Sequence, residues 1–333
     1  MRVLVTGAAG YVGSHACKSL AQAGFEPIGL DNLERSGIEN LPWGPLEVAD
    51  ICDRPSLDEV LRKYRPQAAM HFAAYAYVGE SVATPDTYYR NNVGGSITLL
   101  SALHDAGIDK FVFSGSCAVY GMPMTCPMAE SHPQAPISPY GASKQMVERI
   151  LLDCEAAFGI RHVVLRYFNA AGADPDGDIG ECHDPETHVI PLAIQTALGQ
   201  LPVFEVFGTD YATPDGTAIR DYVHVSDLAS AHVRSLQYLL EGHASITLNL
   251  GTGRGHSVLE VVKAVETTTQ RKVNLRKAPR RPGDPPILVA DPSRAGAVLD
   301  WRPTITDITG IVQTAVNWEL KKREILAAAP VHP

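Results

Sequence analysis

The first half of the chain alternates short runs of apolar residues with longer stretches in which apolar positions recur at helical spacing. The short runs, rich in β-branched and aromatic residues, predict strands at 3–6, 26–30, 68–73, 111–114 and 163–167. The longer stretches predict helices at 11–24, 56–64, 87–106 and 139–158. Such alternation is typical of βαβ units, so we predict an α/β fold with a doubly wound parallel sheet covered on both faces.

The character of the sequence changes after Asn169, where residues 171–178 concentrate turn-forming glycine, proline and aspartate. We therefore predict a first domain over residues 1–169 and a smaller C-terminal α/β substrate domain over most of residues 170–333. An apolar run at 246–251 resembles a further strand of the first sheet. Segments near 220–256 are therefore expected to return to the first domain.

Composition narrows the classes of partner. With 333 residues, of which 45% are hydrophobic, the chain can bury a core large enough for two unequal domains. The net charge is −9 and basic residues are interspersed with acidic ones, so nothing favours nucleic acid as a partner. We also expect no membrane segment, because no stretch approaches the roughly 20 apolar residues that a span requires. The six cysteines lack metal-ligand spacing and the density of a disulfide scaffold, which favours reduced thiols in the cytoplasm.

Potential metal ligands gather in one stretch, where Glu181, His183, Asp184, Glu186 and His188 fall within eight residues. The stretch is predicted to be a loop, and its residues lack the ligand spacing of a recognised metal motif. We therefore interpret these side chains as solvated surface groups and predict no metal site.

Three glycines, Gly7, Gly10 and Gly13, separate the first predicted strand from the first predicted helix. In dinucleotide-binding turns, one glycine permits the tight turn, one lets the backbone approach a pyrophosphate, and one lets the helix pack closely. Asp31 follows the second predicted strand, 18 residues after Gly13, near the expected position of a carboxylate that hydrogen-bonds the adenosine ribose. The spacing predicts a Rossmann-like domain that binds NAD, because Asp31 would repel the additional phosphate of NADP.

Two neighbouring positions leave alternatives open. Arg35 lies close enough to weaken the argument against NADP, although we interpret it as a solvated surface charge. Asp50 and Ile51 follow another short apolar run, where contact with the adenine ring and capping of a turn are equally compatible with the spacing.

A catalytic group is predicted around a helix start, with Ser138 as N-cap and Pro139 at the first helical position. Tyr140 and Lys144 then lie on one face of the helix. A phenol titrates near pH 10, so to act as a base near neutrality it needs the positive potential of Lys144, the helix N-terminus and a bound nicotinamide. Ser116 follows a predicted strand at the carboxyl edge of the sheet, where doubly wound folds bind ligands.

The alternative is that Tyr140 packs its ring into the core while Lys144 is solvated, which is the commoner fate of an isolated Tyr-x-x-x-Lys. The glycine turn and Asp31 precede this pair at suitable distances. We therefore predict that Ser116, Tyr140 and Lys144 form one proton-transfer site.

Together these segments resemble the extended short-chain dehydrogenase/reductase superfamily, and within it the UDP-glucose 4-epimerases, over essentially the whole chain. The matching stretches are 6–15, 31–33, 71–74, 78–81, 88–93, 114–121, 138–144, 165–169, 206–211, 215–217, 220–225 and 280–284. So many matches in the same order make the resemblance specific.

The resemblance implies reversible inversion of C4 in a UDP-hexose, interconverting UDP-glucose and UDP-galactose with a tightly bound NAD. Tyr140 would remove the proton of the sugar 4-hydroxyl while hydride leaves C4, and Ser116 would hydrogen-bond the same oxygen. Lys144 would hold the cofactor ribose and tune Tyr140. The 4-keto sugar would turn over in its pocket before hydride returns to its opposite face. The family also implies a homodimer formed through a helix bundle.

Further contacts follow from the same resemblance. Those to the cofactor are Gly7, Gly10, Tyr11, Val12, Gly13, Asp31, Asn32, Asp50, Ile51, Phe72, Ala73, Ala74, Asn91, Ser114, Tyr140, Lys144, Tyr167 and Phe168. Those to the UDP-sugar are Ser116, Tyr140, Asn169, His188, Val189, Val206, Phe207, Arg220, Tyr222, Arg281, Asp284 and Leu288. The two arginines suit this task because a guanidinium grips phosphate oxygens bidentately, although either could instead belong to a surface ion pair.

Two positions depart from the family pattern. Ala76 stands where many UDP-glucose 4-epimerases have a lysine that helps hold the cofactor, and residues 74–81 also resemble epimerases of UDP-arabinose and UDP-xylose. Leu288 stands where hexose-restricted relatives often have tyrosine and relatives that admit N-acetylated sugars have a small residue. UDP-pentose and UDP-N-acetylglucosamine therefore remain alternative substrates.

Other activities are less compatible with the residues after Ser116. Nucleotide-sugar dehydratases and decarboxylases place acidic residues where this chain has Cys117 and Ala118, which cannot supply the additional acid or base of an elimination. Non-catalytic NAD-binding sensors usually lose the tyrosine or the lysine, and both are present here.

Overall fold

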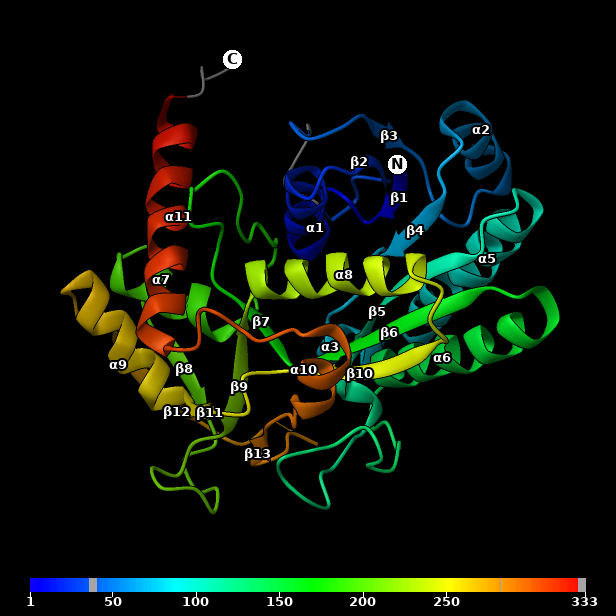
Figure 1. Cartoon of the computed structure of the whole chain (residues 1–333). Helices are drawn as coiled ribbons and strands as arrows, with labels where there is room; N and C mark the ends of the chain where they lie inside the picture. The colour runs from blue at the N-terminus through cyan, green and yellow to red at the C-terminus, as the bar shows by residue number, and fades with distance from the viewer. Residues whose placement is uncertain (36–40, 282, 329–333) are drawn as a thin grey trace.

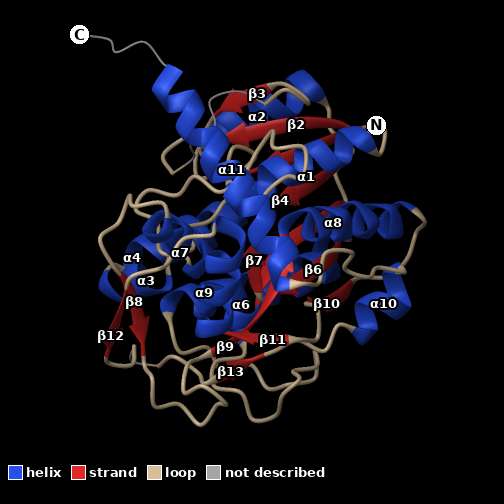
Figure 2. Ribbon diagram, turned by 90° about the vertical axis from the view of Figure 1, so that its left-hand side faces the viewer, coloured by secondary structure: helices blue, strands red, loops and turns tan. Residues whose placement is uncertain are grey.

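The computed structural model describes residues 1–35, 41–281 and 283–328. It confirms the predicted fold class: a seven-stranded parallel sheet is flanked by helices, and shorter sheets form a smaller part of the molecule (Figures 1 and 2). Within the described ranges, every helix is too short or too polar to cross a membrane.

The large sheet follows the order β10-β6-β5-β4-β1-β2-β3, and all its neighbouring strands are parallel. Its strands are β1 (Arg2–Thr6), β2 (Glu26–Asp31), β3 (Leu46–Val48), β4 (Ala68–His71), β5 (Lys110–Ser116), β6 (Arg161–Tyr167) and β10 (Ile246–Leu250). The strand order reverses between β1 and β4, whose last residues are joined by a 2.6 Å hydrogen bond between Thr6 Oγ1 and His71 Nδ1. Doubly wound sheets bind ligands at the carboxyl ends of the strands at such a reversal.

Helices cover both faces of this sheet (Figure 1). They are α1 (Tyr11–Gln22) and α8 (Val225–Leu240) on one face, and α2 (Arg54–Tyr64), α5 (Ser96–Asp105) and α6 (Pro139–Phe158) on the other. In β1, Val3 and Val5 pack in the core beneath α1 and α8, whereas Leu4 packs in the core on the opposite face. Because both faces are covered, successive residues of the strand are apolar, which explains the uninterrupted runs in the sequence.

The predicted helix at 87–106 is interrupted. The structure has α4 (Pro85–Tyr88), then a π-helical segment at Tyr89–Gly95, then α5. A Cβ at Gly95 would lie only 2.6 Å from Ile51 Cδ1, so the chain passes the core closely here. Within the π-helical segment, Asn92 accepts a hydrogen bond from the backbone N–H of Tyr75 and donates to its carbonyl oxygen. Period and composition do not reveal this segment, because it depends on contacts with a distant loop.

The smaller part of the molecule contains two short sheets and three packed helices. In one sheet, β9 (Ile219–His224) pairs with β7 (Asn169–Ala171), β11 (Gly255–Ser257) and β13 (Ile287–Leu288), and in the other β8 (Phe204–Phe207) pairs with β12 (Leu275–Ala278). The helices are α7 (Val189–Ala197), α9 (Val258–Thr269) and α11 (Ile308–Ala328). Shorter helices lie at α3 (Val78–Ala83), η2 (Cys117–Val119) and α10 (Ser293–Leu299). Between β9 and β11 the chain returns to the larger part of the molecule, where α8 covers the large sheet and β10 is one of its strands.

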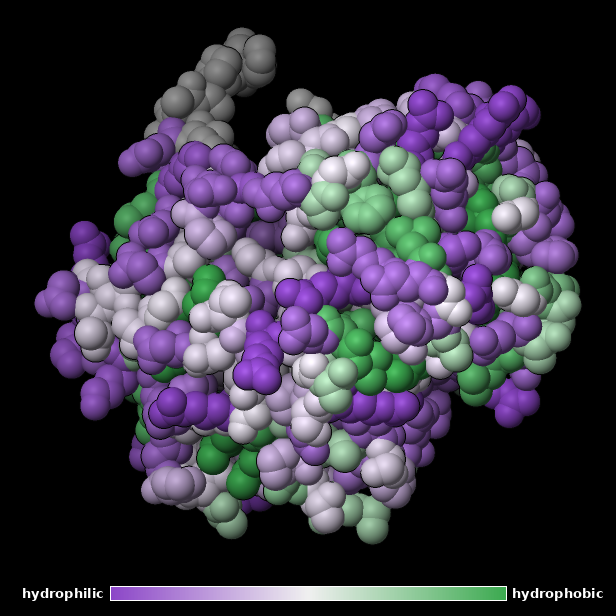
Figure 3. All heavy atoms as spheres, in the orientation of Figure 1, coloured by the Kyte–Doolittle hydropathy of each residue, from purple (hydrophilic) through white to green (hydrophobic). Residues whose placement is uncertain are grey.

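Hydrophilic side chains cover most of the face seen in Figure 3, with smaller hydrophobic areas between them. This mixture agrees with the interspersed charges of the sequence. All six cysteines have free thiols.

Candidate active site

The glycine turn joins β1 to α1 at the carboxyl edge of the large sheet. Gly7 has a φ of +71°, and a Cβ there would lie 2.5 Å from the backbone nitrogen of Ala73. At Gly13 a Cβ would lie 2.0 Å from the carbonyl oxygen of Gly7. Gly10 is the N-cap of α1 and brings no side chain over the first backbone N–H groups. The turn therefore fits the pyrophosphate of a dinucleotide, which such N–H groups bind.

Asp31 ends β2 beside this turn. One carboxylate oxygen accepts a 3.0 Å hydrogen bond from the backbone of Ala9, and the other accepts a 2.9 Å hydrogen bond from Leu33. Nearby, Asn32 donates to Asp50 over 3.3 Å, and Asp50 also accepts from the backbone of Cys52. The structure thus places three predicted cofactor contacts at neighbouring strand ends.

Arg35 is not the solvated charge that the sequence suggested. Its guanidinium forms two hydrogen bonds to Glu80, of 3.0 and 2.7 Å, and stacks 4.8 Å from the ring centre of Tyr75. The sequence interpretation was wrong because Glu80 is 45 residues away along the chain. With its charge paired, Arg35 no longer weakens the argument for NAD from Asp31.

The predicted catalytic residues meet where α6 begins. Ser138 caps this helix by accepting a 3.2 Å hydrogen bond from the backbone of Gly141, and Pro139 is the first helical residue. Gly141 allows close packing, because a Cβ there would lie 2.5 Å from the carbonyl oxygen of Ala118. The first turn of α6 consequently approaches the end of β5, and Tyr140 forms a side-chain hydrogen bond with Ser116.

Burial controls the electrostatics of this group. It raises the pKa of Tyr140 above the usual value, although the hydrogen bond with Ser116 acts in the opposite direction. Burial also lowers the pKa of Lys144 to about 8. Lys144 Nζ donates a 2.9 Å hydrogen bond to the carbonyl oxygen of Ser114 and lies 6.0 Å from the ring centre of Tyr140. The protein alone therefore does not lower the pKa of the phenol as the sequence argument expected, because desolvation outweighs the hydrogen bond with Ser116.

A buried hydrogen-bond network that the sequence analysis missed joins α6 to β6. Arg166 in β6 donates to both carboxylate oxygens of Glu148, over 2.9 and 2.5 Å. Arg166 also donates to the Tyr120 hydroxyl over 2.9 Å, and that hydroxyl donates to Asn249 over 2.6 Å. The available signal was the position of Glu148, one helical turn beyond Lys144 on the same face.

The predicted contacts at the nicotinamide end lie around the same strand ends. The hydroxyls of Ser114 and Tyr167 are 2.5 Å apart, and Asn91 donates a 3.0 Å hydrogen bond to Asn92. Phe168 is buried, and Leu288 packs against the same cluster.

The predicted substrate contacts fall into two groups. Arg220 forms an ion pair with Asp284, and the guanidinium of Arg281 lies 4.1 Å from the ring centre of Phe207. Leu288 pairs with Arg220 between β13 and β9. By contrast, the side chain of Val206 is buried in the core of the smaller part, so it leaves only backbone groups for a ligand.

The acidic residues and histidines of residues 181–188, which we interpreted as solvated surface groups, are not all separate in the structure. Glu181, His183, Glu186 and His188 converge, with one potential ligand atom of each within 4.8 Å of the others, whereas Asp184 does not join them. The predicted contact of His188 with substrate remains a prediction, because this side chain is engaged with Glu181 and Glu186.

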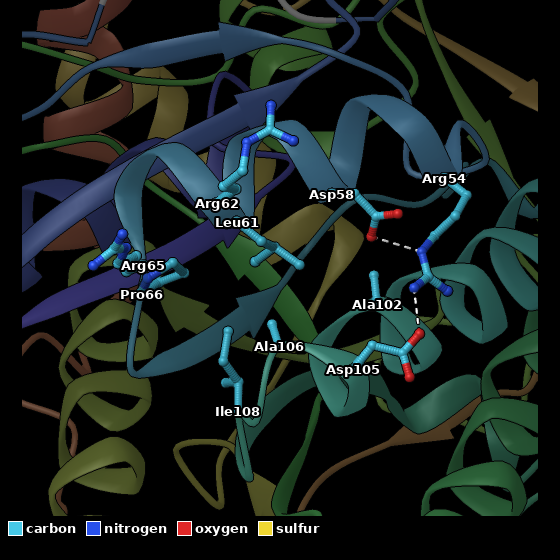
Figure 4. Close-up of a pocket in the computed structure, with 10 residues that line it drawn as sticks. All are labelled: Arg54, Asp58, Leu61, Arg62, Arg65, Pro66, Ala102, Asp105, Ala106 and Ile108. Carbon is cyan, nitrogen blue, oxygen red and sulfur yellow. Dashed lines mark hydrogen bonds and ion pairs between the residues drawn. The ribbon is translucent and has the colours of Figure 1, made fainter.

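A separate hollow of about 480 Å³ lies between α2 and α5 (Figure 4). Arg54 spans its mouth, paired with Asp58 and Asp105. Its lining includes Pro66 and Ile108, which precede β4 and β5. The hollow is therefore distinct from the carboxyl edge that carries Ser116 and the glycine turn.

Comparison with known proteins agrees with this arrangement. The model of the NAD dependent epimerase/dehydratase family matches residues 3–251. A UDP-glucose 4-epimerase of Rhizobium meliloti (strain 1021) is 53% identical over 322 residues, covering 97% of this chain and 98% of that protein.

Two solved structures extend the likeness to the fold. The UDP-glucose 4-epimerase of Brucella ovis in complex with NAD is 49% identical, with a TM-score of 0.92 and coverage of 95% of this chain and 97% of that one. The UDP-glucose-4-epimerase of Stenotrophomonas maltophila, with bound NAD and formylated UDP-arabinopyranose, is 43% identical, with a TM-score of 0.93 and coverage of 99% and 100%. The chain therefore belongs to the NAD dependent epimerase/dehydratase family.

Proposed function

We propose that the chain catalyses the reversible inversion of C4 in UDP-hexoses, interconverting UDP-glucose and UDP-galactose with a tightly bound NAD. The observation that carries this proposal is the meeting of Ser116, Tyr140 and Lys144 beside the glycine turn, in a chain whose full length matches UDP-glucose 4-epimerases. The family's cofactor is NAD, and Asp31 beside the turn suits it.

In the proposed reaction, Tyr140 takes the proton of the sugar 4-hydroxyl and returns it to the 4-keto oxygen after the sugar has turned over. Ser116 hydrogen-bonds the same oxygen in both directions. Bound NAD supplies the acceptor, and then the donor, of the hydride exchanged with C4. Lys144, held at the carbonyl of Ser114, places positive charge near the phenol and would hold the cofactor ribose.

The remaining site residues are proposed to hold the two ligands. Gly7, Gly10 and Gly13 would accommodate the pyrophosphate, while Asp31 would bind the adenosine ribose. The UDP group would bind in the smaller part of the molecule, where Arg220 is now paired with Asp284 and Arg281 lies over the ring of Phe207. The phosphates of UDP would replace these present partners of the two arginines. A guanidinium released from Asp284 or from the ring of Phe207 can grip phosphate oxygens.

Leu288 bears on substrate range. Leu288 packs in the same cluster as Phe168 and Cys117, and Cys117 directly follows Ser116 in the chain. Leucine is smaller than the tyrosine that hexose-restricted relatives have at this position. A pocket bordered by leucine discriminates added groups by only about 1–3 kcal/mol, so UDP-arabinose and UDP-N-acetylgalactosamine are secondary candidates. The formylated UDP-arabinopyranose in the Stenotrophomonas relative supports the first of these.

The proposal is tested by incubating purified protein separately with UDP-galactose, UDP-N-acetylgalactosamine and UDP-arabinose, without added NAD. UDP-glucose should form fastest, because the cofactor copurifies and is regenerated in each cycle. Tyr140→Phe should turn over these substrates far more slowly. Its matched control is Tyr238→Phe, which removes the hydroxyl of a tyrosine in α8 that stacks on His243. Absence of a C4-inverted product from every substrate would overturn the proposal.

We also propose that the protein acts as a cytoplasmic homodimer joined through α5 and α6. Exposed apolar side chains on these helices support this, namely Ile97, Met146, Leu152 and Phe158. Light scattering should give twice the chain mass, and Leu152→Glu should shift it to one chain. We keep the division at residue 169, with α8 and β10 returning to the first domain, as part of the same proposal.

A further inference from the structure

The loop between β7 and α7 holds a cluster of two histidines and two carboxylates that take part in no proton or hydride transfer of the proposed reaction. We call Glu181, His183, Glu186 and His188 the Glu/His cluster. Their potential ligand atoms all lie within 4.8 Å of one another. The loop passes between α1 and α11, where Trp318 donates a 3.0 Å hydrogen bond to the Glu181 carbonyl oxygen (Figure 1).

The distances within the cluster are short, and two of the three contacts share one oxygen of Glu181. Glu181 Oε1 lies 2.9 Å from His183 Nδ1 and 2.7 Å from His188 Nδ1. His188 Nδ1 also lies 2.9 Å from Glu186 Oε1. Ligand atoms around a tetrahedral Zn²⁺ stand about 3.3 Å apart, given metal–ligand bonds of about 2.0–2.1 Å. The three contacts are thus shorter than this spacing, and the remaining ligand atoms lie within 4.8 Å, so small side-chain movements would bring the four ligands to it.

The two carboxylate side chains are mostly buried, and both face histidines, although Glu186 Oε1 also accepts hydrogen bonds from the backbone N–H groups of Thr187 and His188. The side chains of Glu181 and Glu186 are only 7% and 9% exposed, whereas those of His183 and His188 are 24% and 44% exposed. Within the described ranges, the ion pairs of both glutamates come from these histidines and from no lysine or arginine. Buried carboxylates require compensating positive charge, which a divalent cation provides.

A nearby acidic group shows the contrasting arrangement. Asp174, Asp176 and Asp178 also converge, but Lys18 Nζ sits among them at 2.7, 2.8 and 3.0 Å. There an ammonium already occupies the position that a cation would take. In the Glu/His cluster the groups that face the carboxylates are imidazoles rather than an ammonium, and this mixture of imidazole and carboxylate ligands favours transition metals over Mg²⁺ or Ca²⁺.

We propose that Glu181, His183, Glu186 and His188 form a four-ligand site for Zn²⁺ or a similar divalent transition metal. Such a site goes beyond the epimerisation proposed above and takes no part in its steps. All four ligands come from one segment of eight residues, Glu-Cys-His-Asp-Pro-Glu-Thr-His. The metal would fix this loop immediately before α7, whose N-cap is His188.

The surroundings suggest what fixing the loop would do. His183 makes edge-on ring contacts with Tyr11, at 6.2 Å, and with Tyr77, at 5.8 Å. Tyr11 belongs to the glycine turn, and its hydroxyl donates a 2.6 Å hydrogen bond to the Gly172 carbonyl oxygen where the loop begins. A metal at the cluster would thus brace the loop against the dinucleotide-binding turn.

The experiment uses the full-length, NAD-containing protein, stripped with a chelator and titrated with Zn²⁺ alone. Calorimetry and elemental analysis after dialysis should give one Zn²⁺ per chain. His183→Ala and the nearly isosteric Glu186→Gln should each weaken binding by at least about 100-fold, because each removes a ligand. Co²⁺ should give the visible absorption of a tetrahedral site, and excess Mg²⁺ should not displace it.

The matched control is His243→Ala, which removes a histidine paired with a single carboxylate, Glu241, at 3.2 Å. Its Zn²⁺ binding should equal that of the unaltered protein. Circular dichroism without metal separates loss of ligand from loss of fold, and Glu186→Gln keeps the test valid if His183→Ala does not fold. Less than about a tenth of an equivalent of bound Zn²⁺, or equal binding by Glu186→Gln and the unaltered protein, would overturn the proposal, whatever the epimerase assay shows.

Discussion

Helix α6 carries two buried pairs only one turn apart, and they handle charge in opposite ways. Tyr140 and Lys144 face the end of β5, and burial shifts the pKa of each toward its neutral form. One turn further on, Glu148 is joined to Arg166 by two hydrogen bonds, which raise the pKa of the guanidinium and keep it charged. The first pair can therefore exchange a proton, whereas the second is a fixed ionic contact that holds α6 against β6.

The largest expected effect comes from removing the proton-transfer group. Tyr140→Phe should lower kcat by up to about 10⁴-fold, equivalent to about 5 kcal/mol, because a phenylalanine cannot take or return the proton. Bound NAD, measured in denatured samples, should be unchanged. Turnover comparable to that of Tyr238→Phe would show that Tyr140 is not the base.

The fixed pair should respond in stability rather than in chemistry. Glu148→Gln leaves the buried Arg166 without a counter-charge and should lower the free energy of unfolding by about 3–5 kcal/mol. Chemical denaturation measures this, with Asp153→Asn as control, because Asp153 pairs with Arg149 on the exposed side of the same helix. An unaltered denaturation midpoint would contradict a structural role for the pair.

Replacing Lys144 should change the free energy of unfolding in the opposite direction to replacing Glu148. Its pKa is about 8 in the folded protein, against a usual value near 10.5, so below pH 8 the folded state must bury an ammonium without a carboxylate partner. Lys144→Met should therefore raise the free energy of unfolding at pH 7 by on the order of 1–3 kcal/mol, while abolishing turnover. The gain should shrink as the pH rises from 8 toward 10.5, since the folded state then releases the proton and no longer buries a charge. Denaturation at pH 7 and pH 10 tests this sign.

The smallest effect should come from Ser116. Its hydrogen bond acts to lower the pKa of Tyr140, so Ser116→Ala should reduce kcat about tenfold and move the acidic limb of the pH–rate profile, on which activity rises as the phenol ionises, to higher pH. Ser116→Thr, which keeps the hydroxyl, should recover part of the activity. A profile that does not move would separate Ser116 from the phenol.

The same contrast explains what the sequence could predict. The glycine turn, Asp31 and the capped start of α6 follow from local spacing, so their positions were predictable from residues close together in the chain. Glu148 also lies on the predicted helix, but its partner Arg166 is 18 residues away on a strand, and hydrophobic period carries no information about that pairing. The Glu/His cluster shows the limit most clearly, because its eight residues are contiguous and yet their convergence depends on α1, α11 and Tyr77.

The central claim is that hydrogen leaves C4 of the sugar and returns to C4 within one site. It is tested most directly by converting UDP-galactose to UDP-glucose in D₂O without added NAD and examining the product by NMR. The account predicts UDP-glucose with hydrogen retained at C4, because the hydride never exchanges with solvent. Deuterium at C4, or a deoxygenated sugar in place of UDP-glucose, would contradict it.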